Sequence, residues 1–272
     1  MIQCTPTVLD LPGFRISADA EAGGRITELF HHPLGRNLLA AGEPEACLTL
    51  EGGQSFAIAG WIEAFPSLEP CGEIPTLGHA WRTPAACVLR GQRLLSHWHI
   101  PGWRLVRTIR ATSRTVTAEY TVANLNPDPA AMLWAAHVLF PLAGLAHAEL
   151  RAGRLLPGPQ CDLQALASHL EDVDNGWRIP APRRCGRSWK FFLPAARAVV
   201  LHYDDATLTL STTAPWWGIW LNLGAHQTAC LGIEPTTAPT DSVSEVPTPL
   251  VGNGRHSIAW QLQIDLLGGM PA

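Results

Sequence analysis

Two ionisable side chains stand next to apolar runs of the sequence. In "AMLWAAHVLFPL" this group is His137, and in "LGIEPTTAPTDS" Glu234 follows an apolar run. An imidazole and a carboxylate are groups that commonly exchange protons with a substrate near neutral pH. A histidine in an apolar strand is also often a core residue whose ring nitrogens are satisfied by hydrogen bonds. Both interpretations of His137 stay open at this level.

Glu234 lies between the apolar run Cys230–Ile233 and Pro235. Because a proline cannot donate to a sheet ladder, we expect the strand to stop or to lie at a sheet edge here. This places Glu234 at a strand end, where functional sites are common. An exposed glutamate at a turn explains the same string, since unpaired glutamates are rarely buried.

Two further stretches hold polar side chains that are candidates for catalysis or binding. "PTLGHAWRTPA" places His79, Trp81 and Arg82 in a segment punctuated by glycine and proline, which predicts a loop. In "LLSHWHIPGW", His97 and His99 are two residues apart, so we expect both on one face of a strand and Trp98 on the other. A tryptophan ring is also a flat apolar surface on which a sugar can stack.

The His-x-His pair has the spacing of metal ligands on a strand. A metal site needs further ligands, and the sequence offers none at a diagnostic spacing. A cupin-like site needs an acidic residue shortly after the second histidine, and "HIPGWRL" has none. We therefore expect no metal, and a metal-dependent enzyme that uses His97 and His99 is kept as an alternative.

Lys190 is the only lysine among 19 basic residues. In a chain that otherwise uses arginine, a position that keeps the compact ammonium group is a candidate for a specific role. Chance explains the same count equally well. We list Lys190 as a candidate substrate-binding residue.

Composition excludes several classes of partner. The net charge is -4 and no run of Lys or Arg occurs, so we expect no nucleic acid partner. No apolar run is long enough to cross a bilayer, and "MIQCTPTVLD" lacks the pattern of a signal peptide. The 7 cysteines include no C-x-x-C pair, which indicates reduced thiols that fill apolar gaps. These features predict a cytoplasmic protein without a membrane partner.

The elements that position these residues read as many short strands separated by turn signals, with clear alternation in "VTAEYTVAN" and "WQLQIDL". So many strands predict one all-β domain over residues 1–272, built as a large antiparallel β-sandwich. Helical spacing occurs only in residues 161–173, "CDLQALASHLEDV", which predicts a short helix or an irregular insertion within 150–190. The flanking segments 151–160 and "IPAPRRCGRSW" look like long loops. No G-x-S-x-G, P-loop or Rossmann glycine pattern is present.

Taken together, the sequence resembles the aldose 1-epimerase (galactose mutarotase-like) family, whose fold is a β-supersandwich. The resemblance covers most of the chain and rests on five stretches in the family's order. They are "AGGRITELFHHPLGRNLL" (22–39), "LGHAWRTP" (77–84), "NLNPDPAAMLWAAHVLFPL" (124–142), "GIEPTTAPTDS" (232–242) and "LVGNGRHSIAWQLQI" (250–264).

The resemblance implies a sugar mutarotase that needs no cofactor. His137 is implied as the general acid that protonates the ring oxygen, and Glu234 as the general base that removes the proton of the anomeric hydroxyl. The ring opens to the free aldehyde, the C1–C2 bond rotates, and the ring closes on its other face. The substrate-binding candidates are His79 near the ring oxygen, Arg82 on another hydroxyl or an anionic group, Trp81, Lys190, His97 and His99.

The sequence also departs from the family pattern. The acid segment reads "HVLF" rather than His-Pro-Tyr-Phe, and no "WDH"-like segment supplies an acidic sugar ligand. Lys190 in "SWKFF" or Asp174 in "VDNGW" is a candidate for that region. Lys190 with Arg82 favours a phosphorylated or acidic sugar as a hypothesis.

Other functions stay open. One alternative is a non-catalytic carbohydrate-binding or sensing domain on the same fold. A lyase or hydrolase on a related sandwich is expected to have a longer chain or an added helical domain. The expected partner is a small-molecule sugar, and the expected state is a monomer or a homodimer.

Overall fold

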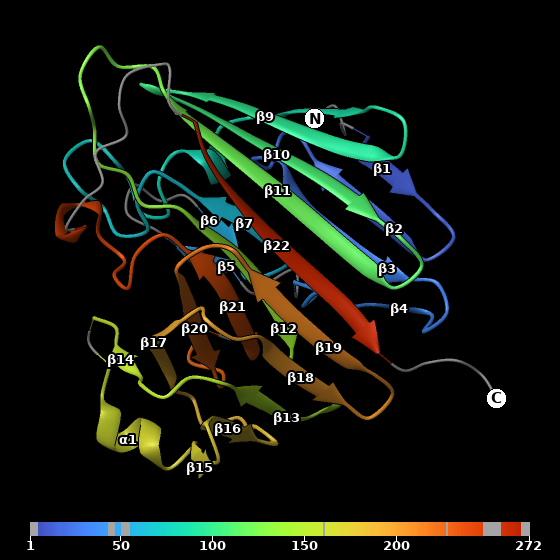
Figure 1. The fold of residues 1–272 in the computed structure, drawn as a ribbon, viewed down its shortest axis with the longest axis vertical. Coiled ribbons are helices and arrows are strands. Elements are labelled where there is room, and N and C mark those ends of the chain that lie inside the picture. The colour runs from blue at the N-terminus through green and yellow to red at the C-terminus, as the bar shows by residue number, and fades with distance from the viewer. Residues whose placement is uncertain are drawn as a thin grey trace.

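The alternating apolar and polar residues of the sequence build two antiparallel sheets of 10 strands each, packed face to face (Figure 1). The computed structural model describes residues 5–42, 47–49, 55–159, 161–226, 228–246 and 257–267. The predicted all-β sandwich is therefore confirmed. No helix of these described ranges is long and apolar enough to cross a membrane.

The first sheet contains most of the candidate residues. Its strands in spatial order are β1 (Thr7–Asp10), β2 (Phe14–Asp19), β3 (Arg25–His31), β7 (Trp61–Ala64), β12 (Ala135–Pro141), β21 (Cys230–Thr236), β20 (Trp216–Asn222), β17 (Ser188–Pro194) and β14 (Leu156–Pro157), with β4 (Arg36–Asn37) paired to β3.

The second sheet covers the inner face of the first. Its strands in spatial order are β15 (Glu171–Val173), β16 (Gly176–Pro180), β13 (Leu145–Leu150), β18 (Val199–Tyr203), β19 (Thr207–Thr212), β22 (Ser257–Leu267), β11 (Thr115–Asn124), β10 (Trp103–Ala111), β9 (Arg93–Ile100) and β8 (Ala86–Leu89).

The remaining elements are short. They are the hairpin β5 (Cys47–Thr49) and β6 (Ser55–Ala57), the helix α1 (Leu163–Ala167), and the 3-10 turns η1 (Ala80–Arg82) and η2 (Val243–Glu245). The predicted short helix within 161–173 is confirmed by α1, which begins where the Asp162 side chain accepts from the N–H of Ala165 (3.0 Å).

Several local expectations need correction. The segment "IPAPRRCGRSW" is not one long loop, because β16 extends to Pro180 and β17 begins at Ser188. Strand β17 begins two residues before Lys190 and buries Trp189, Phe191 and Phe192. Of the five described free thiols, Cys230 is buried, three pack partly buried against apolar clusters (Cys71, Cys87 and Cys161), and Cys185 is exposed, so the prediction of thiols as apolar fillers is wrong for Cys185. Residues 250–256 of the last family-like stretch lie outside the described ranges.

The core between the sheets contains one ion pair. Glu63 on β7 and Arg107 on β10 are both 0% exposed, and Arg107 Nη1 donates to Glu63 Oε1 (2.8 Å). The Tyr120 hydroxyl donates to the same oxygen (3.2 Å), and Trp134 Nε1 donates to Oε2 (3.0 Å). Both carboxylate oxygens are thus satisfied by groups from opposite sheets, which fixes how the sheets face each other.

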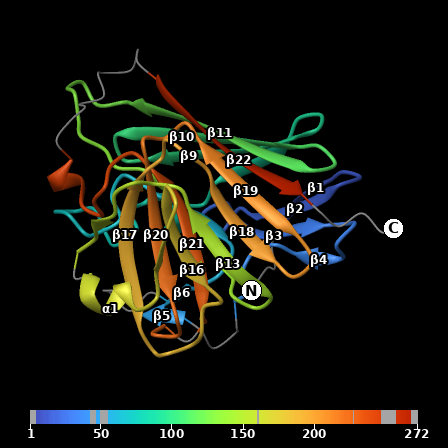
Figure 2. The same ribbon diagram turned by 60° about the horizontal axis from the view of Figure 1, so that its bottom comes forward.

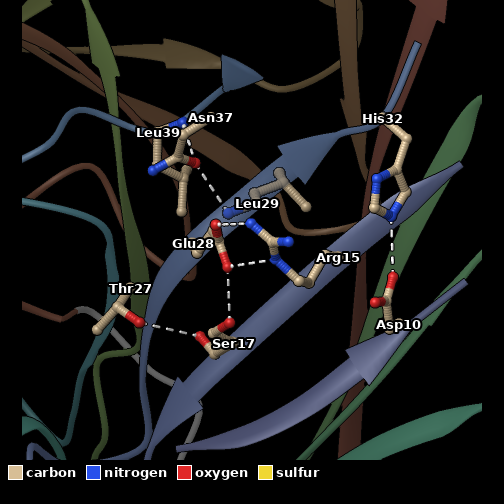
Figure 3. A network of polar contacts seen from close by, with 9 residues as sticks. All are labelled: Asp10, Arg15, Ser17, Thr27, Glu28, Leu29, His32, Asn37 and Leu39. Carbon is tan, nitrogen blue, oxygen red and sulfur yellow. Dashed lines mark hydrogen bonds and ion pairs between the residues drawn. The ribbon is translucent and has the colours of Figure 1, made fainter. Parts of the chain in front are cut away.

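The edge of the first sheet is tied by surface hydrogen bonds (Figure 3). Glu28 on β3 accepts two hydrogen bonds from Arg15 on β2 (2.7 and 3.0 Å) and one from Ser17 (2.8 Å). Asn37 Oδ1 accepts from the N–H of Leu29 (2.9 Å), which attaches β4 to β3. The asparagine of the "NLL" string therefore has a structural role.

Candidate active site

Glu234 lies in the middle of the first sheet, in β21, which pairs with β12 on one side and β20 on the other. The strand continues through Pro235, so the expectation that it stops or forms a sheet edge there is wrong. Pro235 pairs in register with Trp217 on β20, whereas the register with β12 skips from Ala135 to Val138. The missing N–H of the proline is tolerated because the ladder with β12 is interrupted at this point.

Strand alternation puts the candidate residues on one face of this sheet. Apolar neighbours such as Ile219 and Ile233 face the core between the sheets, so the residues next to them in sequence face the opposite way. His137, Lys190 and Glu234 share that opposite face on β12, β17 and β21. Figure 2 shows β17, β20 and β21 side by side. Ordinary strand geometry therefore brings together residues that are far apart in the sequence.

His137 and Glu234 are in direct contact. His137 Nδ1 lies 2.7 Å from Glu234 Oε1, which is ion-pair distance, although the direction does not suit a hydrogen bond and both atoms lack a hydrogen-bond partner. Glu234 is 0% exposed and His137 is 7% exposed. The alternative of an exposed glutamate at a turn is therefore wrong. A buried polar atom without a hydrogen bond is uncommon in a stable core and marks this pair as unusual.

Lys190 reaches the same carboxylate from two strands away. Its side chain crosses β20 at Gly218, which stands opposite Glu234 in register. A Cβ at position 218 would lie 3.3 Å from Lys190 Cε and 3.4 Å from Glu234 Oε2. Lys190 Nζ donates a hydrogen bond to Glu234 Oε2 and lies 3.6 Å from Asp241 Oδ1. The glycine leaves the space through which the ammonium group meets the carboxylates.

His137, Lys190 and Asp241 border a cavity of about 200 Å³, and Glu234 lies behind Lys190 without lining it. The lining residues are Leu68, Glu69, Leu77, His137, Lys190, Trp220 and Asp241. A larger cavity of about 500 Å³ lies against β13 and β16, and no histidine lines it. We assign the candidate active site to the smaller cavity because an imidazole, an ammonium group and carboxylates converge there.

The charges of the site favour an ionised Glu234. Burial raises the pKa of this carboxyl, but the positive charges of Lys190 and His137 outweigh burial and lower the pKa to about 2. Burial also opposes the charged form of Lys190, yet Asp241 and Glu234 outweigh it and raise the pKa of the ammonium group. Burial raises the pKa of Asp241, and Lys190 offsets this only in part. A pKa of about 2 leaves Glu234 ionised at neutral pH.

His79, Trp81 and Arg82 lie beside the cavity rather than in its lining. The N–H of His79 donates to the carbonyl of Phe65 (2.7 Å), and Trp81 packs in the same apolar cluster as Leu77 and Trp220. The guanidinium of Arg82 lies over the Trp81 ring, 4.8 Å from its centroid. These side chains support the wall that Leu77 and Trp220 form.

His97 and His99 lie elsewhere. They belong to β9 in the second sheet, and Trp98 between them is fully buried, so the predicted facing of this strand is confirmed. No other His, Cys, Asp or Glu of the described chain joins them in a cluster of three with ligand-like spacing. The structure does not bring them to His137 and Glu234.

Sequence reasoning named His137 and Lys190 but none of the other lining residues, of which Asp241 and Trp220 lie closest to the candidate pair. Asp241 stands in the stretch quoted for Glu234, and its charge beside a glutamate is the signal that marks it. Trp220 alternates with buried Ile219 and Leu221 in β20, which puts it on the site face of the sheet. Its ring centroid lies 5.4 Å from that of His137.

Comparisons with known proteins identify the fold. No protein-family model matches the chain, and no curated protein matches it by sequence. The Slr1438 protein of Synechocystis sp. PCC 6803 superposes with a TM-score of 0.75 at 14% identity, over 98% of this chain and 96% of that chain. The galactose mutarotase related enzyme of Lactobacillus acidophilus gives 0.70 at 11% identity, over 98% of both chains.

A third solved structure carries an enzyme name. The galactose 1-epimerase of Lactobacillus acidophilus NCFM superposes with a TM-score of 0.64 at 14% identity, over 97% of this chain and 95% of that chain. These likenesses extend over nearly the whole of each chain. The protein therefore has the galactose mutarotase-like fold, as the resemblance of its motifs implied.

Proposed function

We propose that this protein is an aldose 1-epimerase-like enzyme that interconverts the α and β anomers of a sugar, with His137 as the acid and Glu234 as the base. The observation that carries the proposal is the contact between His137 Nδ1 and Glu234 Oε1 (2.7 Å) beside a cavity. Fold neighbours that include a galactose 1-epimerase support it. The acid and the base lie on the adjacent strands β12 and β21, so the two groups are already close enough to act on one substrate molecule.

The proposed chemistry is a balanced transfer of two protons. The ring oxygen and the anomeric hydroxyl are bonded to the same carbon, so one acid and one base close together can serve both. His137 gives a proton to the ring oxygen while Glu234 takes the proton of the anomeric hydroxyl. The C1–ring oxygen bond breaks and leaves an open-chain aldehyde. Rotation about C1–C2 and the reverse proton transfers then close the ring as the other anomer.

Lys190 controls access to the base in this proposal. A carboxylate with a pKa of about 2 is ionised at neutral pH and is a weak base. When Lys190 leaves Glu234 Oε2 for a sugar hydroxyl, the carboxylate loses its strongest charge partner and becomes more basic. Glu69 and Trp220 in the lining offer the sugar a hydrogen-bond acceptor and an apolar face.

The hypothesis of a phosphorylated or acidic sugar loses support from these contacts. Lys190 already pairs with Glu234 and Asp241, so an anionic substrate has to compete with two carboxylates. Arg82 stacks on Trp81 and donates to the carbonyl of Thr76 (3.4 Å). We expect neutral aldoses to react at least as fast as their phosphates. A clear preference for phosphates in side-by-side assays would restore the anion hypothesis.

One observation favours a second function, a carbohydrate-binding or sensing domain without catalysis. Glu234 is fully buried behind Lys190 and does not line the cavity, whereas a base has to touch its substrate. If Lys190 stays in place when a sugar binds, the sugar meets only the ammonium group and the lining residues. Binding of a sugar without exchange of its anomers is the result that this function predicts.

Proton NMR exchange between anomers, over a panel of aldoses at neutral pH, tests both functions. We expect faster exchange with the protein, and a rate lower by about 10²–10⁴-fold in Glu234→Gln and in His137→Asn, as loss of an acid or a base usually gives. Glu28→Gln and His32→Asn change the same residue types at the sheet edge and serve as matched controls that keep full activity. Turnover like that of the wild type in either site variant contradicts the assignment.

A further inference from the structure

A second group of ionisable side chains lies on the outer face of the second sheet. His147 and Glu149 are two residues apart in β13, so they share a face, and His202 on β18 stands opposite His147 in register. The intervening Ala148 is buried in the core. The three polar side chains are 24–30% exposed, which leaves them reachable from solvent. This group is on a different sheet from His137 and Glu234.

The facing atoms of this group are close but do not hydrogen-bond. Glu149 Oε1 lies 3.8 Å from His147 Nε2 and 3.5 Å from His202 Nε2. All three atoms lie within 4.8 Å of one another, and no other group of three such residues in the described ranges does. Ligand atoms about 2.0–2.2 Å from a tetrahedral ion are roughly 3.3–3.6 Å apart. The two imidazole rings are stacked, with centroids 4.2 Å apart and an angle of 17° between their planes, so the rings have to turn out of this stack for both Nε2 atoms to point at one ion.

Neighbouring groups contact the far atoms of Glu149 and His202, on the side away from the cluster. Arg151 donates to Glu149 Oε2 through Nη2 (2.9 Å) and Nε (3.3 Å), so Oε1 stays available. The Thr207 hydroxyl lies 3.5 Å from His202 Nδ1, and His202 Nε2 has no hydrogen-bond partner. Partners that fix the far atom of a ligand in this way are the usual outer shell of a metal site.

We propose that His147, Glu149 and His202 form a binding site for a divalent transition-metal ion, with Zn²⁺ as the ion that fits best. Two imidazole nitrogens and one carboxylate oxygen are a ligand set that suits Zn²⁺. Three protein ligands leave a further position open for water or an anion. Glu149 also borders the cavity of about 500 Å³, whose lining includes Arg151, Arg178 and Arg197.

The arginines that line this cavity favour an anionic co-ligand for the metal ion. Guanidinium groups repel a free cation and attract an anion, so the metal and an anionic co-ligand should bind more tightly together than separately. The sequence alone could not indicate this site, because His202 is far from His147 in the chain and only strand pairing brings them together.

Zinc titration of the EDTA-treated full chain, by calorimetry and by competition with a chromogenic chelator, tests the proposal. We expect one Zn²⁺ per chain in the wild type. We expect at least tenfold weaker binding in His202→Ala, in His147→Ala and in the isosteric Glu149→Gln, which keeps the shape of the site. The double variant His97→Ala/His99→Ala removes the other exposed histidine pair and should change the affinity less than twofold.

Visible absorption of Co²⁺ bound in place of Zn²⁺ adds a spectroscopic test. The wild type and the His97→Ala/His99→Ala variant should show the same ligand-field bands, and His202→Ala should lose them. Absence of stoichiometric binding in the wild type overturns the proposal. So does unchanged affinity in both His147→Ala and His202→Ala, or loss of binding in the His97→Ala/His99→Ala variant.

Discussion

The first sheet carries two buried glutamates, Glu63 and Glu234, in very different surroundings. Glu63 faces the core, where Arg107, Tyr120 and Trp134 satisfy both carboxylate oxygens. Glu234 faces the other side of the same sheet, where Lys190 satisfies one oxygen and the other lies against His137 without a hydrogen bond. Both carboxylates are 0% exposed, so burial alone does not distinguish them.

The difference lies in what surrounds each charge. At Glu63, burial is the dominant effect and raises the pKa despite Arg107. At Glu234, the combined positive charge of Lys190 and His137 outweighs burial and lowers the pKa. A carboxylate with all its partners has no capacity left for a ligand, whereas one with an open oxygen beside a cavity can accept a hydroxyl. This contrast separates a structural ion pair from a candidate site better than burial does.

Removal of Arg107 is expected to have the largest effect on stability. Arg107→Met leaves the Glu63 charge in the core without its cation, and breaking such a pair typically costs about 3–5 kcal/mol. Urea unfolding at neutral pH measures the loss. The double variant Glu63→Gln/Arg107→Met removes both charges and should recover part of it. A single-variant loss below about 1 kcal/mol would show that the core pair is not structurally important.

Acid unfolding sharpens the comparison between the two glutamates. The pKa of Glu234 falls from 4.5 to about 2 on folding, so its contribution is present above pH 4.5 and is lost as the pH falls toward 2. Glu63 has the opposite sign, because its raised pKa makes ionisation unfavourable as the pH rises above 4.5. Between neutral and acid pH, Glu234→Gln should therefore lose less unfolding free energy than the wild type does, by on the order of 2–3 kcal/mol.

Urea titrations at several pH values between about 2.5 and 7 provide that measurement, because this range spans the usual pKa values of carboxyl groups. Glu28→Gln, at the exposed sheet edge, is the control for removing a carboxyl group outside the site. Parallel pH profiles of the wild type and Glu234→Gln would mean that Lys190 and His137 do not hold Glu234 ionised.

The smallest expected effect comes from one methyl group. The Cβ of Gly218→Ala lies at 3.3–3.4 Å from Lys190 and Glu234 Oε2, so the lysine has to shift by a few tenths of an ångström. We expect a change in unfolding free energy within about 1 kcal/mol and a higher pKa of Glu234, measured by carbon-13 NMR of the carboxyl group. Gly153→Ala, whose added Cβ meets nothing within 4 Å, is the matched control. An unchanged pKa in Gly218→Ala would show that Lys190 reaches Glu234 without needing the gap.

Much of the fold is predictable from the sequence, because alternation marks strands such as β11 and turn residues separate them. Strand β17 is not predicted, and strand β21 is predicted but with the wrong extent and place in the sheet. β17 follows an Arg- and Gly-containing loop, and β21 contains Pro235, which argues locally against a central strand. In β21 the surrounding ladder overrides the local preference of the proline.

The site is less predictable, because it depends on which strands become neighbours. The sequence picks out His137, Glu234 and Lys190 individually, and only the sheet order β12–β21–β20–β17 shows that they meet. His97 and His99 are equally conspicuous in the sequence yet belong to the other sheet. Trp220 carries no motif of its own and is identified by its position on the site face of β20, whereas Asp241 lies beyond the end of β21 and is identified by its place in the cavity lining.

The passage of Lys190 across β20 at Gly218 also bears on how fast Glu234 can be uncovered. Glu234 sits on a strand held by neighbours on both sides. Lys190 is held in turn by ion pairs to Glu234 and Asp241, and its side chain is largely buried. Under the proposed function, uncovering the base therefore requires the lysine to break both ion pairs, and loss of these contacts rather than free side-chain rotation limits how fast that step can be.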